Sequence, residues 1–147
     1  MSNDANNMEK FEFLLGEWSL EYHVPQSSFS RAATGSGKGL FKRILNDKYV
    51  TFDYECCLTT GNGRAHAIFA WDSKAQIYRY WWFEDTGNFS SAVCDFISDE
   101  VLFLHWNDVL LSQTFRKIDS NKIELRMEQP IAQDCKELIL EVILTRK

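Results

Sequence analysis

Ten short segments rich in Val, Ile, Thr and aromatic residues follow one another along this 147-residue chain. Asn, Asp and Gly separate them roughly every eight to twelve positions, as in a series of β-hairpins. The predicted strands are 17–24, 38–45, 48–59, 64–71, 76–84, 89–97, 100–106, 109–118, 122–129 and 137–146. The pattern predicts an all-β fold, an up-and-down antiparallel β-barrel of about ten strands. We expect one domain over residues 1–147, with residues 1–7 flexible.

The segment Gly16-Glu17-Trp18 starts the first predicted strand and indicates how the barrel closes. It follows a short apolar stretch, residues 8–15, which we expect to form a short N-terminal helix, and glycine permits a sharp turn out of that helix. An even number of strands returns the last strand to the end where the first begins, so Arg146 should meet Trp18. Because a guanidinium can stack on an indole, we predict that Gly16, Trp18 and Arg146 close the barrel.

The helix, the Gly-x-Trp segment, the long first loop and the terminal arginine together resemble the calycin superfamily of lipocalins and fatty-acid-binding proteins. The stretches 14–18, 68–72 and 78–82 are similar to an uncharacterised bacterial family of lipocalin-like domains of unknown function. The resemblance covers the whole chain. It implies a cup for a small, largely apolar molecule, with catalysis as the exception.

Aromatic residues make up 14% of the chain, and each large ring buries roughly 150–250 Å². Strand alternation and loop lengths place many of them inside, together with Ser91 and Val93 on the sixth strand. The predicted ligand-binding residues are Tyr22, Tyr54, Tyr80, Trp82, Trp106, Gln113 and Met127. A wall with many rings and few hydrogen-bonding groups suits a small hydrophobic or aromatic ligand. Alternatively, the rings pack on one another and fill the barrel.

The link 25–36 is the longest between predicted strands and carries one large apolar residue, Phe29. It leaves the first strand at the end opposite Trp18, where the link 130–136 also lies. Long loops at the mouth of a scaffold are often functional. The segment is therefore either a flap over an open mouth or an ordinary solvated loop.

Two adjacent residues, Trp81 and Trp82, cannot both face the interior, so one large ring lies on the outer wall. Phe83 and Phe103 are candidate neighbours for it there. Apolar residues on an outer wall usually lie under a covering element or a second copy of the chain. We expect a homodimer, or an interaction module that works through these rings.

The sequence offers no convincing catalytic set. His66 and His105 are of the residue type that shuttles protons or binds iron, but the predicted register places both outside, as it does His23. Glu84 and Asp85 precede Gly87-Asn88 and fit turn chemistry better than the acid–base pair of a cyclase or isomerase.

Cofactor and metal sites are not expected either. Nitrobindin-like barrels resemble the chain in size and in the opening Gly-x-Trp, and they bind haem through a histidine on a late strand; here no histidine follows His105. Gly35-x-Gly37-x-Gly39 resembles a phosphate-binding run only superficially, because it enters a strand and not a helix.

Charge and cysteine usage limit the partners and the compartment. The net charge of −5 without a basic cluster argues against nucleic acid. Residues 1–10 lack the features of a signal peptide, and no apolar run approaches the ~20 residues of a membrane span. The cysteines, Cys56, Cys57, Cys94 and Cys135, show no CxxC spacing, so we expect free thiols and a cytoplasmic protein.

Overall fold

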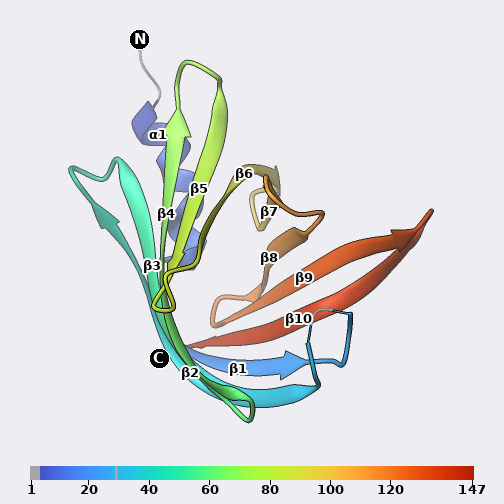
Figure 1. The fold of residues 1–147 in the computed structure, drawn as a ribbon. Coiled ribbons are helices and arrows are strands. Elements are labelled where there is room, and N and C mark those ends of the chain that lie inside the picture. Colours follow the sequence, from blue (N-terminus) through green and yellow to red (C-terminus); the bar gives the residue numbers. More distant parts are fainter. Residues whose placement is uncertain (1–3, 29) are drawn as a thin grey trace.

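The computed structural model describes residues 4–28 and 30–147, and within them the chain forms a closed antiparallel barrel of ten strands (Figure 1). A helical segment, α1 (Asp4–Glu9) and the 3-10 turn η1 (Lys10–Leu14), precedes the strands. These are β1 (Gly16–Val24), β2 (Ala33–Ile44), β3 (Tyr49–Leu58), β4 (Gly61–Asp72), β5 (Ile77–Glu84), β6 (Phe89–Ser98), β7 (Val101–Trp106), β8 (Ser112–Asp119), β9 (Lys122–Ala132) and β10 (Cys135–Arg146). Each strand pairs with its neighbours in the chain and β1 pairs with β10, which confirms the predicted fold class. No helix within the described ranges is long and apolar enough to cross a membrane.

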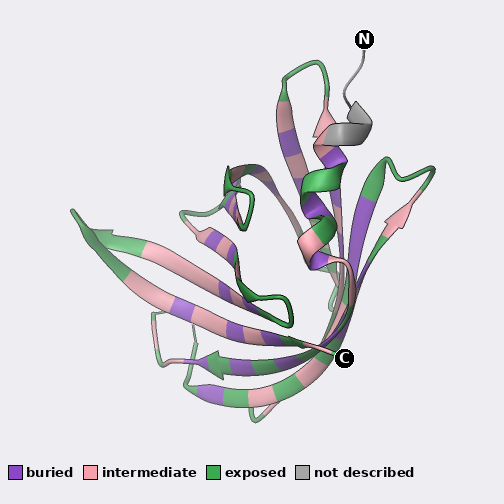
Figure 2. Cartoon of the chain, turned by 180° about the vertical axis from the view of Figure 1, so that it is seen from behind, coloured by how far each residue is buried: buried purple, intermediate pink, exposed green. Residues whose placement is uncertain are grey.

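The alternation of side chains puts one face of each strand into the core. Along β1 the even-numbered residues from Trp18 to Val24 are buried and the odd-numbered residues between them are exposed, as the bands in Figure 2 show. Successive side chains on a strand point to opposite faces, so this banding identifies the inner wall. The core is therefore the interior of the barrel.

The N-terminal helical segment plugs one end of the barrel. Phe11 and Leu14 of η1 are fully buried, and the Phe11 ring lies 5.0 Å from that of Phe69 on β4. The indole Nε1 of Trp18 donates a hydrogen bond to the Leu14 carbonyl at 2.7 Å, which ties the turn to the first strand. This end of the barrel is therefore packed shut.

Arg146 completes the plugged end. It pairs with Trp18 in the β1–β10 register, and its guanidinium lies 4.2 Å from the centre of the indole ring. It also donates hydrogen bonds to the carbonyls of Leu15 at 2.6 Å and Phe13 at 3.3 Å. Gly16 has a φ of 116°, and a Cβ atom there would lie 2.8 Å from the Arg146 guanidinium. Only glycine combines this backbone conformation with room for the arginine.

Strand β2 carries its alternate glycines on the inner face, where they lie beneath the side chains of β3. Gly39 pairs with Tyr54, and a Cβ atom on Gly39 would lie 2.5 Å from the Phe52 ring. That ring stacks on Phe41 at 3.9 Å. Gly39 thus makes space for an aromatic ring, whereas a Cβ atom on Gly35 or Gly37 would overlap a backbone carbonyl oxygen of β3. All three glycines therefore have a packing role.

Several strand boundaries differ from the prediction. β2 begins at Ala33 instead of 38, so the first loop is residues 25–32. β9 runs on to Ala132, so most of the predicted link 130–136 belongs to the β9–β10 hairpin, and β8 begins at Ser112 instead of 109. Phe29 and residues 1–3 of the segment predicted to be flexible lie outside the described residues, and residues 4–7 belong to α1.

The predicted inner face of β6 is wrong. Ala92 and Cys94 are buried there, whereas Ser91 and Val93 alternate with them on the other face. The last residue pair of β5 and β6, Phe83 with Phe89, is joined by five residues, 84–88. The prediction assumed an even number, and an odd number reverses which residues of β6 face inward. A bulge at the end of β6 compensates, so the predicted inner residues of β7 are nevertheless buried.

Candidate functional site

An enclosed cavity of about 50 Å³ remains inside the barrel. Five of the seven predicted ligand-binding residues line it: Tyr22, Tyr54, Tyr80, Gln113 and Met127. The rest of the wall is Phe52 and aliphatic side chains. Because an ordered water needs roughly 10–15 Å³ measured in this way, the cavity holds a small functional group but not a ring system. The barrel is therefore filled with side chains over most of its length and hollow at one place.

Trp82 and Trp106, the other two predicted residues, support this wall from behind. Trp82 donates a hydrogen bond from Nε1 to the Tyr54 hydroxyl at 2.8 Å. Trp106 packs edge-on against Tyr80 at 5.5 Å and against Trp82 at 6.0 Å. Its own Nε1 is buried without a hydrogen-bond partner in the described part of the chain. The two indoles hold the tyrosines in place, and all seven residues belong to one cluster.

Three of the four polar groups of the cavity are strongly buried and form no hydrogen bond with the described protein. Tyr22, Tyr80 and Gln113 are 7%, 2% and 5% exposed. Their side chains form no hydrogen bond with any residue in 4–28 or 30–147. Tyr54 accepts the bond from Trp82, which leaves its own proton free to donate. These four polar groups come from β1, β3, β5 and β8 and meet in the same small space.

Burial keeps the tyrosines of the cavity protonated. Desolvation, followed by the repulsion that a charge on Tyr54 would exert, raises the pKa of Tyr22 and Tyr80 well above the usual value. Desolvation also raises the pKa of Tyr54 to about 12, partly opposed by the hydrogen bond from Trp82. All three phenols are neutral hydrogen-bond donors near pH 7.

A larger pocket of about 700 Å³ lies at the open mouth of the barrel. It shares the lining residues Met127 and Leu140 with the inner cavity, so the two spaces adjoin at these side chains. Loop residues Ser30 and Arg31 form part of its rim. The sequence did not predict Ile139, which is buried in this wall. Strict alternation places Ile139 on the outer face, between the predicted inward residues Leu138 and Leu140. A bulge in β10 shifts the register between those two residues and turns Ile139 inward.

The first loop is attached to the β9–β10 hairpin beside the mouth. The Ser28 hydroxyl donates to Glu137 at 2.9 Å, and the Gln129 amide donates to both Ser28 and Glu137 at 2.7 Å. The Gln129 amide and then the Ser28 hydroxyl hold the pKa of Glu137 below its usual value. These bonds position the loop residues at the rim.

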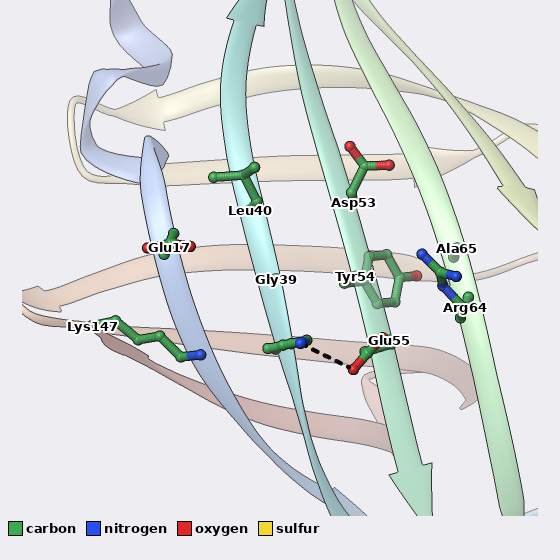
Figure 3. A pocket seen from close by; sticks show the side chains of 10 residues that line it. Glu17, Gly39, Leu40, Asp53, Tyr54, Glu55, Arg64, Ala65 and Lys147 are labelled. Carbon is green, nitrogen blue, oxygen red and sulfur yellow. Dashed lines mark ion pairs between the residues drawn. The ribbon is translucent and has the colours of Figure 1, made fainter.

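A second, polar pocket of about 280 Å³ lies on the outer wall over β1–β4. Figure 3 shows Glu17, Asp53, Arg64 and Lys147 around it, and the dashed line marks the ion pair of Glu55 with Lys38 at 3.8 Å. Charges of both signs alternate here and are solvated. Such exposed pairs contribute little to binding.

The side chains considered for catalysis lie away from the cavity. The Nδ1 of His66 is hydrogen bonded to the Asp53 carboxylate on the outer wall, and His105 is exposed. Glu84 accepts hydrogen bonds from Thr86 and Asn88 within its own turn. Among the described residues no three His, Cys, Asp or Glu side chains gather closely enough to hold a metal ion.

The outer wall of β5 and β6 carries exposed rings. Trp81 and Phe83 are 37% and 45% exposed, and Phe89 is 72% exposed. Phe103 on β7 is half-buried. Of the predicted outer aromatics, Trp81 is the tryptophan of the adjacent pair that faces outward.

Known proteins match the chain in fold but not in sequence. No family model matches it, and no curated protein matches it. Rv2717c from M. tuberculosis superposes with a TM-score of 0.68 at 11% identity, covering 100% of this chain and 99% of that one. The S-type phycobiliprotein lyase CPES from Guillardia theta gives 0.65 at 7% identity over 98% and 95% of the two chains.

A de novo designed fluorescence-activating β-barrel gives a TM-score of 0.51 at 10% identity and covers all of both chains. At these identities the similarity establishes the fold alone. The chain shares with these structures the fold of a closed, up-and-down antiparallel barrel, which has ten strands in its described residues.

Proposed function

We propose that this protein binds a small, largely apolar molecule, which enters through the mouth pocket and reaches the inner cavity. The observation that carries the proposal is the adjacency of the two spaces across Met127 and Leu140. Together they offer an apolar surface with a few convergent polar groups, which is the usual composition of a small-molecule site. The similarity in fold to a phycobiliprotein lyase and to a fluorescence-activating barrel supports the same kind of role.

Binding can be tested by blocking the passage between the spaces. Leu140→Trp places a large ring where the mouth pocket meets the inner cavity, whereas Ile143→Trp adds the same ring to the outer face of the same strand. We expect a neutral apolar fluorophore such as Nile red to bind saturably to the unmodified protein and to Ile143→Trp, and at least tenfold more weakly to Leu140→Trp. Circular dichroism checks that both variants keep the fold. Equal binding to both variants, or no saturable binding to the unmodified protein, contradicts the proposal.

Catalysis by a cyclase or isomerase mechanism has less support. The lining of the inner cavity contains no carboxylate and no histidine among the described residues. General acid–base catalysis most often uses such a group, although tyrosine can also serve. Here burial raises the pKa of Tyr22, Tyr54 and Tyr80, which disfavours their action as bases near pH 7. A binding role fits the wall better.

Three further parts of the proposal rest on indirect support. The exposed rings of Trp81, Phe83 and Phe89 favour a homodimer through this wall, and sedimentation of Phe83→Ser against the unmodified protein tests it.

The four cysteines are free in the described chain, which favours a reducing compartment such as the cytoplasm. Membership of the bacterial lipocalin-like family stays a prediction from the sequence.

A further inference from the structure

The polar groups of the inner cavity restrict what can occupy it. Tyr22, Tyr80 and Gln113 are each more than nine-tenths buried and line the cavity. Their polar atoms form no hydrogen bond with the described residues, but they keep accessible surface, unlike the fully buried and unpartnered Nε1 atoms of Trp71 and Trp106. Buried polar groups in native proteins are nearly always hydrogen bonded. A group that occupies the cavity must therefore satisfy them.

Donors outnumber acceptors in this wall. Tyr22, Tyr54 and Tyr80 each offer one O–H donor. The oxygens of Tyr22 and Tyr80 can also accept, whereas the Tyr54 oxygen already accepts from Trp82. The Gln113 amide adds two N–H donors and one carbonyl acceptor. With this amide included, five N–H or O–H donors stand against three free acceptor atoms. An occupant that presents hydrogen-bond acceptors therefore fits the wall better than one that presents donors.

The charge of the occupant follows from what the wall lacks. In the described chain no Lys, Arg, His, Asp or Glu lines the inner cavity. An ionised carboxylate or ammonium taken from water into such a site keeps its desolvation penalty without an opposite charge to offset it. A neutral group with two lone pairs, such as a carbonyl oxygen, meets the donors without that penalty.

We infer that the site selects an apolar molecule with a neutral carbonyl group at its inner end, placed among Tyr22, Tyr80 and Gln113, with its ring system in the mouth pocket. The inference rests on the proposed binding function and adds the chemical class and the orientation of the ligand. The volumes agree with it: about 50 Å³ takes a small head group, and about 700 Å³ takes a ring system. The opposite orientation would place an anionic head group beside Arg31 at the rim.

Four naphthalene probes that differ in one substituent separate these possibilities. They are 2-acetylnaphthalene, a neutral ketone; 2-naphthoate, an anion; 2-naphthylmethylammonium, a cation; and 2-ethylnaphthalene, which has no polar group. We expect the ketone to bind about tenfold more tightly than each of the others, the gain of one to two well-made hydrogen bonds. The infrared carbonyl stretch of bound 2-acetylnaphthalene should move to a lower wavenumber than in an apolar solvent.

Variants that remove one hydroxyl locate the head group. Tyr80→Phe should weaken ketone binding about tenfold and leave 2-ethylnaphthalene unchanged. Tyr78→Phe is the matched control, because the Tyr78 hydroxyl donates to the Asn7 carbonyl at the plugged end. If circular dichroism shows that Tyr80→Phe does not fold, the affinity of Gln113→Leu for the ketone gives the same test.

Each of the other possible results with the four probes refutes one part of the inference. Equal affinity for the ketone and 2-ethylnaphthalene refutes selection of a carbonyl and leaves the binding function standing. Tightest binding of naphthoate, lost in Arg31→Ala, shows the reverse orientation. Tightest binding of the ammonium probe refutes the neutral head group. Failure of all four probes to bind overturns the proposed function and this inference with it.

Discussion

Replacement of Arg146 by methionine tests whether the plugged end holds the barrel closed. The substitution keeps an unbranched side chain but removes the guanidinium that lies 4.2 Å from the Trp18 ring. It also removes the donors to the carbonyls of Leu15, Phe13 and Ser120. We therefore expect a loss of stability well above that of an ordinary surface substitution.

The magnitude follows from these contacts. A cation–π contact contributes about 0.5–2 kcal/mol. A hydrogen bond to a charged group contributes about 1.5–3 kcal/mol. Arg146 is half-buried, so we count only its shortest bond, to Leu15 at 2.6 Å, at full strength. The total is about 2–5 kcal/mol, which lowers Tm by roughly 4–20 °C for a domain of this size.

Urea unfolding followed by circular dichroism measures this loss. Arg116→Met is the matched control, because Arg116 is exposed on the outer wall, and it should change the unfolding free energy by about 0.5 kcal/mol or less. A double-mutant cycle with Trp18→Phe isolates the contact between the two side chains, and we expect a coupling of about 0.5–1.5 kcal/mol. If Arg146→Met unfolds at the same urea concentration as Arg116→Met, closure does not depend on this arginine.

Three further predictions follow from the packing. Gly39→Ala should lower the unfolding free energy by about 1–3 kcal/mol because its Cβ would overlap a ring of β3. Gly63→Ala, whose Cβ would meet its nearest atom at 3.7 Å, should leave it nearly unchanged by urea unfolding. The free energy of unfolding should fall as the pH rises from 10 to about 12. The Tyr54 phenol has a pKa near 10 in the unfolded chain and about 12 in the folded protein, so the unfolded chain releases this proton first. Iodoacetamide should label exposed Cys57 in the native protein but Cys94 only after unfolding, since Cys94 is buried and burial raises its pKa; mass spectrometry reads both.

The closed barrel could be predicted from the sequence because its determinants are local. Turn residues and side-chain alternation give the number of strands, and an even number brings both chain ends of the meander to one side. That reasoning places Arg146 beside Trp18, and the two are direct partners in the β1–β10 register. The inner positions of strands with strict alternation, such as Ile123 and Leu125 on β9, follow in the same way.

The remaining errors come from single-residue events that alternation cannot reveal. The five residues 84–88 between the paired ends of β5 and β6 inverted the predicted face of β6, and a bulge at the end of β6 cancelled the error before β7. A bulge in β10 likewise puts Ile139 into the wall of the mouth pocket. An extra residue in a strand or turn leaves little trace in the local sequence, but it reverses which face of the sheet every later side chain occupies.

The question of a hollow or filled barrel depends on fit across the core, which no single strand encodes. Phe41 and Phe52 stack at 3.9 Å, and Tyr54 adds a third ring at 4.5 Å, so these rings fill the space beside the plug. Gly39 of β2 leaves room for that stack. The cavity remains where Gln113 of β8 and three tyrosines meet aliphatic residues of β10, among them Leu140 and Val142. The position of this cavity thus depends on contacts between strands that lie far apart in the sequence, such as β1, β5 and β8.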